Sequence, residues 1–189
     1  MRTLIVSEFM TLDGVMEAPG GEPTHPHTGW VVPYGVPELF QYKLEETLAA
    51  GSLLLGRVTY ESFASAWPAR DGEFADKMNS MPKYVVSGSL ENPEWANSTV
   101  LSGDLASEIS DLKSRYDGDI LVAGSARLVQ ALTSLDLVDE YRLMVFPTIL
   151  GSGKRLFTDD TEQSDLRLAG TLAAGDCTVL TFRPANRGQ

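Results

Sequence analysis

Short apolar runs alternate with amphipathic stretches along most of the chain. The runs at 3–7, 53–55 and 120–123 are too short for helices and are typical of strands buried within a sheet. Between them, stretches such as 37–50 and 105–116 repeat apolar residues at helical spacing. This pattern predicts strands and helices in alternation, which is the order of an α/β sheet.

The stretch 37–50 shows how the helices are expected to pack. Phe40, Leu44 and Leu48 recur at a spacing of four residues. We therefore expect these three side chains to form the buried stripe of the helix. Gly51 is expected to end it.

The C-terminal part of the chain is instead a run of strands. Residues 139–147 alternate in polarity, and 166–172 and 178–183 are expected to pair as antiparallel strands. The whole pattern predicts a three-layer α/β fold, with helices on both faces of a mostly parallel central sheet and an antiparallel C-terminal edge. No repeat or linker interrupts it, so residues 1–189 are expected to form a single domain.

The net charge argues against one class of binding partner. The chain has 26 acidic and 15 basic residues and a net charge of −11. Nucleic-acid binding needs a concentrated positive face, so that class of partner is not expected. A small anionic ligand stays compatible with this charge, because a local cluster of arginines can dominate its own pocket.

The sequence carries no strong metal or targeting signal. Cys177 is the single cysteine, so no intrachain disulfide is expected. His25 and His27 are close in sequence but have no third ligand in view, so no metal is expected. The N-terminus meets an acidic residue too early for a signal peptide, and no apolar run approaches the roughly 20 residues that span a bilayer. A cytoplasmic location is expected.

One stretch carries candidate ligand chemistry, because the apolar run 53–55 is followed by Gly56, Arg57 and Thr59. Glycine lets the backbone turn or approach a ligand closely, and arginine offers a planar charged fork that suits phosphate. Thr59 can cap the helix that follows, whose exposed N–H groups attract anions. The stretch predicts either a grip on a phosphorylated ligand or an ordinary strand–turn–helix joint with a surface arginine.

Two further strand ends carry small residues. Ser87 and Ser89 follow a strand. They are expected either to donate hydrogen bonds to a phosphate or to form an ordinary turn. Residues 124–127 open a helix directly after the strand 120–123, which allows close approach to phosphates. The dinucleotide fingerprint G-x-G-x-x-G is not met after the first strand, and 151–154 does not fit the phosphate-loop pattern and opens no helix.

A long loop rich in proline and glycine occupies residues 17–37. Loops of this length inside a domain are often lids or binding loops. Trp30 and Tyr34 are expected either to wall a pocket or to anchor the loop.

Several motifs resemble a known superfamily. The segment 56–62, Gly-Arg-Val-Thr-Tyr-Glu-Ser, resembles the G-R-x-T-[WY]-E-S segment of dihydrofolate reductase. The strand that ends at Ser87 and the turn at 122–127 resemble two other segments of that enzyme. The start at 11–14 and the segment 145–153 are closer to the reductase domain of the riboflavin-biosynthesis deaminase/reductase. The similarity runs from about residue 3 to residue 183.

This resemblance implies an NADPH-dependent reductase, which transfers a hydride to a C=O or C=N group of a small pyrimidine-like or pterin-like heterocycle. It implies that Arg57 and Ser87 hold the 2′-phosphate of the cofactor. Thr59 and residues 124–127 would hold the pyrophosphate, and Asp13 and Gly14 would lie near the nicotinamide. A homodimer is also implied. The implied cofactor-binding residues are Asp13, Gly14, Gly56, Arg57, Thr59, Ser87, Gly88, Gly124, Ser125, Ala126 and Arg127.

Reduction also needs a proton. The resemblance points to a carboxylate early in the first helix, where Glu38 lies one residue short of the expected spacing, and Asp13 is the other candidate. The sequence shows no deaminase domain and none of its zinc pattern, which leaves open whether the riboflavin intermediate is the substrate. The alternative function is an NADP-binding module of the same fold without catalysis.

Overall fold

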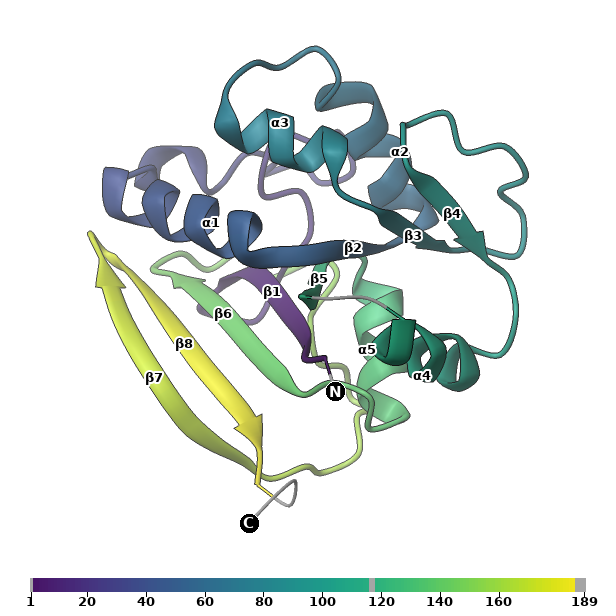
Figure 1. Cartoon of the computed structure of the whole chain (residues 1–189). Coiled ribbons are helices and arrows are strands. Elements are labelled where there is room, and N and C mark those ends of the chain that lie inside the picture. Colours follow the sequence, from purple (N-terminus) through teal and green to yellow (C-terminus); the bar gives the residue numbers. More distant parts are fainter. Residues whose placement is uncertain (1, 116–117, 186–189) are drawn as a thin grey trace.

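A single sheet of eight strands organises the computed structural model, which describes residues 2–115 and 118–185. The strands follow the order β4-β3-β2-β5-β1-β6-β8-β7 (Figure 1). From β4 to β6 the neighbouring strands are parallel, whereas β8 is antiparallel to both β6 and β7. The predicted mostly parallel sheet with an antiparallel C-terminal edge is confirmed. The strands are β1 (Leu4–Thr11), β2 (Ala50–Gly56), β3 (Lys83–Val86), β4 (Ser98–Leu101), β5 (Asp119–Ala123), β6 (Glu140–Phe146), β7 (Leu166–Ala174) and β8 (Cys177–Pro184).

Helices cover both faces of the sheet, as predicted. α1, α2 and α3 lie on one face, and α4 and α5 lie on the other (Figure 1). Leu53 and Leu55 of β2 pack with α2 and α3, while Leu54 packs with α4 and α5. The short apolar run is therefore a strand buried on both sides. The helices are α1 (Pro37–Ala49), α2 (Arg57–Ala66), α3 (Glu73–Ser80), α4 (Leu105–Arg115) and α5 (Ala126–Ser134).

The buried stripe predicted for α1 is wrong. Phe40 and Leu48 are 60% and 36% exposed, and Leu44 is only half-buried. The apolar repeat of this helix does not face the sheet. The side of the helix towards the sheet instead carries charged residues, which find partners on β1 and β6. The buried residues of this helix are Leu39, Glu46 and Thr47.

Some element boundaries differ from the prediction by a few residues. α1 ends at Ala49, and Gly51 lies within β2 instead of ending the helix. β1 continues to Thr11, whose carbonyl accepts the N–H of Gly14 (3.0 Å) in the turn that follows. Tyr116, where α4 was predicted to end, lies outside the described residues.

Aromatic contacts anchor the long loop 17–37 at the carboxyl end of β6. Trp30 is 6% exposed, and its ring meets Phe146 edge-on at a centroid distance of 5.3 Å. Tyr34, at the end of the 3-10 turn Val32–Tyr34, meets the same ring at 5.8 Å. Of the two roles predicted for Trp30, its burial supports the anchor.

Candidate functional site

The carboxyl ends of β1, β2, β3 and β5 form the edge of the sheet where the predicted cofactor residues lie. Gly56 ends β2, and Gly124 directly follows β5. The chain leaves β1 through α1 on one face of the sheet and leaves β5 through α5 on the other (Figure 1). In α/β sheets, ligands bind outside the carboxyl ends of strands where the chain reverses direction in this way. The predicted residues therefore lie at a favourable position for a ligand.

The two strand–glycine–helix junctions touch each other. The N–H of Gly56 donates to the hydroxyl of Ser125 (2.8 Å), which in turn donates to Oγ1 of Thr59 (2.8 Å). Gly56 is the N-cap of α2 and no side chain caps this helix, so the predicted capping role of Thr59 is wrong. Instead, Ser125 joins the starts of α2 and α5, and two helix N-termini open at one place.

Glycine makes this close contact possible. A Cβ atom at Gly56 would lie 3.0 Å from Oγ of Ser125, and one at Gly124 would lie 2.9 Å from Cγ2 of Thr59. Gly124 and Ser125 have positive φ angles of 70° and 72°. A left-handed backbone is strained at a non-glycine residue, and such strain is often found at functional sites. A backbone cradle beside two helix N-termini fits the pyrophosphate of a dinucleotide.

Arg57 and Ser87 lie at neighbouring strand ends, as a shared phosphate site requires. Gly56 of β2 pairs with Val86 of β3, and these residues directly precede Arg57 and Ser87. The Arg57 side chain is 46% exposed and donates to the carboxylate of Glu61 at 2.9 Å. An exposed pair at this helical spacing is weak, so the guanidinium can exchange this partner for a phosphate.

The turn after β3 is held by its first residue. Oγ of Ser87 accepts the backbone N–H groups of Ser89 (3.2 Å) and Leu90 (3.0 Å). Gly88 is exposed, and a Cβ there would meet no heavy atom within 4 Å. The turn is thus ordered by its own side chain and leaves open space for a ligand above Gly88. On the neighbouring α5, Arg127 is also exposed.

Asp13 ties the end of β1 to the loop after β6. Its carboxylate accepts the Thr11 hydroxyl (2.6 Å) and the backbone N–H groups of Leu150 (3.2 Å) and Gly151 (2.8 Å). The hydrogen bond from Thr11 is the main reason why the pKa of Asp13 lies below its usual value. The neighbouring Gly14 has a φ of 84° and open space around it. Both residues directly follow the carboxyl end of β1.

Glu38 is the second predicted proton donor. It is exposed in the first turn of α1. Among the hydrogen bonds and ion pairs recorded for the described residues, none joins Glu38 to Asp13 or to the two junctions. Among the described residues, the recorded contacts therefore join the two glycine junctions, and none joins Glu38 to Asp13.

Glu8 is a site residue that the sequence analysis missed. It is 4% exposed on β1, and its Oε2 accepts the N–H of Gly124 (3.0 Å). Its Oε1 is buried and has no hydrogen-bond partner among the described residues. Burial disfavours the charged form and raises the pKa of Glu8 to about 8. An acidic residue inside the apolar strand Leu4–Thr11 was the available signal.

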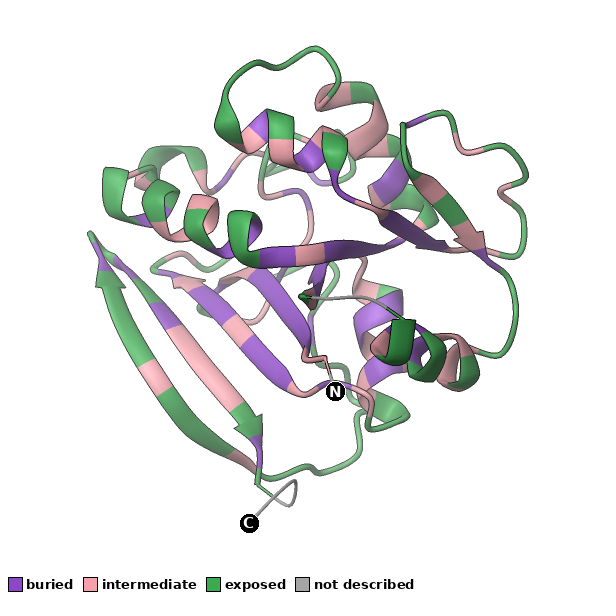
Figure 2. Ribbon diagram, viewed as in Figure 1, coloured by how far each residue is buried: buried purple, intermediate pink, exposed green. Residues whose placement is uncertain are grey.

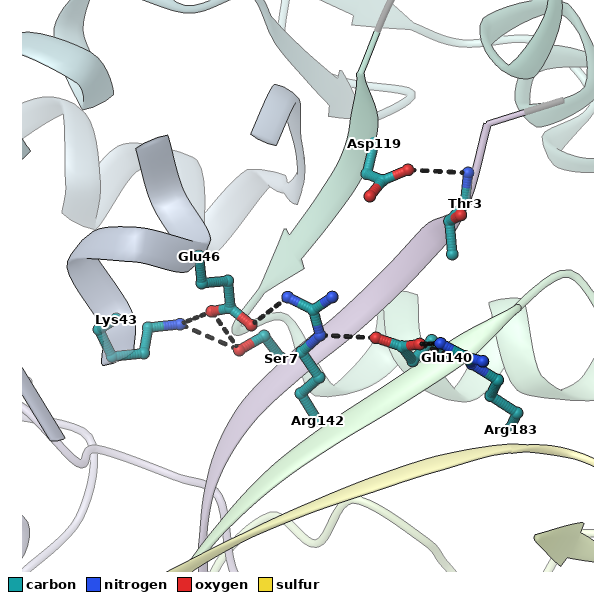
Figure 3. Close-up of polar contacts among 8 residues, drawn as sticks. All are labelled: Thr3, Ser7, Lys43, Glu46, Asp119, Glu140, Arg142 and Arg183. Atoms are coloured by element: carbon teal, nitrogen blue, oxygen red, sulfur yellow. Dashed lines mark hydrogen bonds and ion pairs between the residues drawn. The ribbon is translucent and has the colours of Figure 1, made fainter. Parts of the chain in front are cut away.

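An ionic cluster that the sequence analysis also missed lies between α1 and the sheet (Figure 3). Lys43 and Arg142 both contact the carboxylate of Glu46, at 2.5 Å and 3.2 Å. Arg142 also pairs with Glu140 (2.7 Å), which binds Arg183 (2.8 Å). Burial alone would raise the pKa of Glu46, but Lys43, the hydroxyl of Ser7 and Arg142 together lower it. The signal was the spacing of Lys43 and Glu46, which places both on the face of α1 that holds Leu39.

A cavity of about 450 Å³ adjoins this cluster at the opposite end of the sheet from the glycine junctions. It lies beside the amino ends of β1, β5 and β6 and the hairpin of β7 and β8. Its lining carries acidic and basic side chains in equal number, so its charges are balanced. The lining residues are Thr3, Ile5, Asp119, Asp139, Glu140, Arg142, Arg167 and Arg183.

The two histidines support the loop that holds them. Nε2 of the buried His25 lies 3.1 Å from the carbonyl oxygen of Ser152, and its Nδ1 accepts the N–H of His27 (3.1 Å). Within residues 2–115 and 118–185, no three His, Cys, Asp or Glu side chains come together as metal ligands. No helix in the same ranges has the length and apolar character to cross a bilayer.

Comparisons with known proteins agree with the superfamily that the motifs indicated. A solved structure from Shewanella sp. PV-4, described as a putative riboflavin biosynthesis protein, is 21% identical with a TM-score of 0.70, over 97% of this chain and 99% of that chain. Dihydrofolate reductase from Enterococcus faecalis, solved with NADP(H), is 14% identical with a TM-score of 0.64, over 97% of both chains. The protein YyaP of Bacillus subtilis (strain 168) is 28% identical over 176 residues, or 90% of this chain and 88% of YyaP.

A family model extends the match to nearly the whole chain. The model described as the RibD C-terminal domain matches residues 2–180, which include both glycine junctions and the turn at Asp13. The fold is that of the reductases among its structural neighbours. This chain therefore belongs to the RibD C-terminal domain family.

Proposed function

We propose that this protein is an oxidoreductase that uses NADPH to reduce a C=O or C=N group of a small pyrimidine-like or pterin-like heterocycle in the cytoplasm. The observation that carries the proposal is the contact between the two junctions through Gly56, Ser125 and Thr59. Two helix N-termini that open at one place beside a glycine turn suit a dinucleotide pyrophosphate. Membership of the RibD C-terminal domain family supports the same conclusion.

Each part of the site has a role in holding the cofactor. The backbone of residues 124–127, with Thr59, would bind the pyrophosphate. Arg57 and Ser87 would bind the 2′-phosphate, and the turn at Asp13 would border the nicotinamide. When bound, NADPH supplies the hydride. The chain itself binds, orients and shields the reacting groups.

Two carboxylates are candidates for the residue that donates the proton. Asp13 accepts three hydrogen bonds and its pKa is lowered, so at neutral pH it stays ionised and is a poor proton donor. Glu38 is exposed in the first turn of α1. Both assignments stay predictions, and Glu38 is the better candidate on these grounds.

The second candidate function is an NADP-binding module without catalysis. The ionised, hydrogen-bonded carboxylate of Asp13 favours it, because such a group is poorly suited to donate a proton. Oxidation of NADPH that depends on an added pyrimidine or pterin, followed by absorbance, separates the two functions. Cofactor binding without any such oxidation would support the module.

NADPH is expected to bind at least about tenfold more tightly than NADH, because the 2′-phosphate would gain charge-assisted hydrogen bonds from Arg57. Titration of the nicotinamide fluorescence with protein measures both affinities. Equal affinities would contradict the assignment of a 2′-phosphate site.

Two variants test whether Arg57 causes the preference for NADPH over NADH. Arg57→Ala should weaken NADPH binding far more than NADH binding. Arg115→Ala is the matched control, because Arg115 also forms an exposed pair at helical spacing, with Asp111 (2.7 Å). If Arg57→Ala weakens both cofactors equally, Arg57 does not contact the 2′-phosphate.

We also propose a homodimer, in which a second copy covers β7. This strand forms the outer edge of the sheet and is mostly exposed (Figure 2). Leu168 and Leu172 on it are 57% and 43% exposed. An edge strand with exposed apolar side chains is a typical place for pairing with another chain.

Light scattering is expected to give twice the mass of one chain for the wild type. Leu172→Arg should shift the mass towards a monomer, because it places a charge in the proposed interface. Val58→Arg, at a 62% exposed apolar residue on α2, is the matched control and should leave the mass unchanged. A monomeric wild type at high concentration would contradict the proposal.

A further inference from the structure

Glu8 lies where β1 stops pairing with β5, beside the proposed cofactor site. The pairing of β1 with β5 ends at Ser7 and Ala123, whereas its pairing with β6 continues to Thr11. Just beyond that point, Oε2 of Glu8 accepts the N–H of Gly124 (3.0 Å). The side chain of Glu8 therefore holds the turn after β5 at the place where the pairing of the two strands stops.

The second oxygen of this carboxyl group indicates which protonation state the site favours. Oε1 of Glu8 is buried and has no hydrogen-bond partner among the described residues. A carboxylate that accepts one N–H and is shielded from water is unfavourable, whereas a neutral acid needs less solvation. Burial accordingly raises the pKa of Glu8 to about 8. At neutral pH, Glu8 is therefore a neutral acid whose Oε2 accepts the N–H of Gly124.

Among the described residues, no cation forms an ion pair with Glu8. On α1, Lys43 and Glu46 act on it with opposite sign, and burial has a larger effect than either. Leu143, its neighbour on β6, carries no charge. Arg127 is exposed on α5, and no contact of its side chain with Glu8 is recorded in the described part of the chain. Ionisation of Glu8 would therefore leave an unpaired negative charge next to the turn after β5.

We propose that Glu8 is a positioning residue of the cofactor site, which holds the pyrophosphate-binding turn as the neutral acid and repels the pyrophosphate as the carboxylate. The inference rests on the proposed function, because it takes the pyrophosphate to lie at residues 124–127. A carboxylate bonded to Gly124 would lie a few ångströms from the bound phosphates, and like charges at such a distance repel strongly in a partly buried site. Because linkage is reciprocal, the proton on Glu8 and the cofactor then favour each other's binding.

The affinity for NADPH is therefore expected to fall as pH rises through about 8. Fluorescence titration of the wild type at pH 7 and pH 9.5 should give binding at least about tenfold weaker at the higher pH. NADH shares the pyrophosphate but lacks the 2′-phosphate, so its affinity should fall by a similar factor. Circular dichroism checks that the protein is folded at both values. Equal affinities at the two pH values, or a fall confined to NADPH, would overturn the inference.

Variants assign the pH dependence to Glu8. Glu8→Gln should bind NADPH as the wild type does at pH 7 and should lose the fall at pH 9.5, because the amide accepts the same N–H and does not ionise. Glu8→Ala should bind about tenfold more weakly at pH 7, because Gly124 loses its acceptor. A Glu8→Gln variant with the wild-type pH profile, or a Glu8→Ala variant with wild-type affinity at pH 7, would overturn the inference.

Other groups are controlled in the same experiment. Lys83 also titrates in this range, because burial lowers its pKa to about 8, but it is unchanged in both Glu8 variants. Glu91→Gln, at an exposed position, is the matched control and should keep the wild-type pH profile. A Glu91→Gln variant that loses the pH dependence would overturn the assignment to Glu8.

A measurement on the wild type alone decides if the variants do not fold. Calorimetry of NADPH binding at pH 8.5, in Tris and in bicine, gives the number of protons bound with the cofactor, since the two buffers differ in their heat of ionisation. Uptake of about half a proton is expected, because the cofactor raises the protonated fraction of Glu8. Binding without proton uptake would overturn the inference.

The same measurements separate this inference from the proposed function. A wild type that binds NADPH equally well at both pH values and takes up no proton retains the proposed function and loses the role of Glu8. A wild type that does not bind NADPH at pH 7 loses the proposed function itself.

Discussion

A Gly124→Ala variant is expected to bind NADPH roughly 100-fold more weakly than the wild type. The φ of Gly124 is 70°, where a side chain is strained, and the new Cβ would lie 2.9 Å from Cγ2 of Thr59. Because Ser125 connects this turn to Thr59 and Gly56, a shift at residue 124 moves both junctions. The N–H groups that would face the pyrophosphate then lose their alignment.

Fluorescence titration measures this loss, and a matched glycine controls for backbone strain. Gly72 has a φ of 98°, but a Cβ there would meet no heavy atom within 4 Å. Gly72→Ala should therefore lower the thermal stability by a similar strain and leave NADPH affinity unchanged. If both variants bind NADPH as the wild type does, the turn after β5 is not the pyrophosphate site.

Replacing Glu8 by glutamine is expected to remove a loss of stability that the wild type shows as pH rises. Burial raises the pKa of Glu8 from 4.5 to about 8. Between these values the unfolded chain releases a proton that the folded protein keeps, so the free energy of unfolding falls with rising pH. Above about pH 8 the loss is complete and is on the order of 5 kcal/mol. Glutamine cannot ionise, and its amide oxygen can still accept the N–H of Gly124.

Urea unfolding at pH 5, 7 and 9 measures this difference. The two proteins should have similar stability at pH 5, and Glu8→Gln should be the more stable at pH 9. Glu46, whose pKa is lowered, contributes in the opposite sense, since its stabilisation is lost only as pH falls below its usual value of 4.5. Glu91→Gln, at an exposed position, is the matched control. A wild-type stability that does not change between pH 5 and 9 would contradict the burial argument.

Local patterns predicted the architecture well because they depend on neighbouring residues alone. The apolar runs at 53–55 and 120–123 are too short to be helices, and both are buried strands in the structure. The antiparallel pair of C-terminal strands predicted at 166–172 and 178–183 is β7 and β8. The face of α1 could not be predicted in this way. Glu46 is buried there between Lys43, three residues away, and Arg142, 96 residues away, and helical periodicity carries no information about the second partner.

The candidate site also combines residues that local patterns predict with residues whose role depends on distant contacts. Gly56, Arg57 and Thr59 stand together in sequence, so their association with a helix start was predictable. The bond from Gly56 to Ser125 spans 69 residues, and it replaces the helix cap that was predicted for Thr59. Glu8 and Lys43 were missed because a charged residue is normally exposed. The contacts that place them in the site come from distant residues, the N–H of Gly124 for Glu8 and the hydroxyl of Ser7 for Lys43.

The hydroxyl of Ser125 has a consequence for how this family can evolve. A side chain at Gly56 would collide with Ser125, and one at Gly124 would collide with Thr59. A residue from the other junction therefore limits which side chains fit at each of these four positions. The two junctions nevertheless lie far apart in the sequence. Changes are therefore expected in compensating pairs, and relatives should carry them as correlated substitutions across the two junctions.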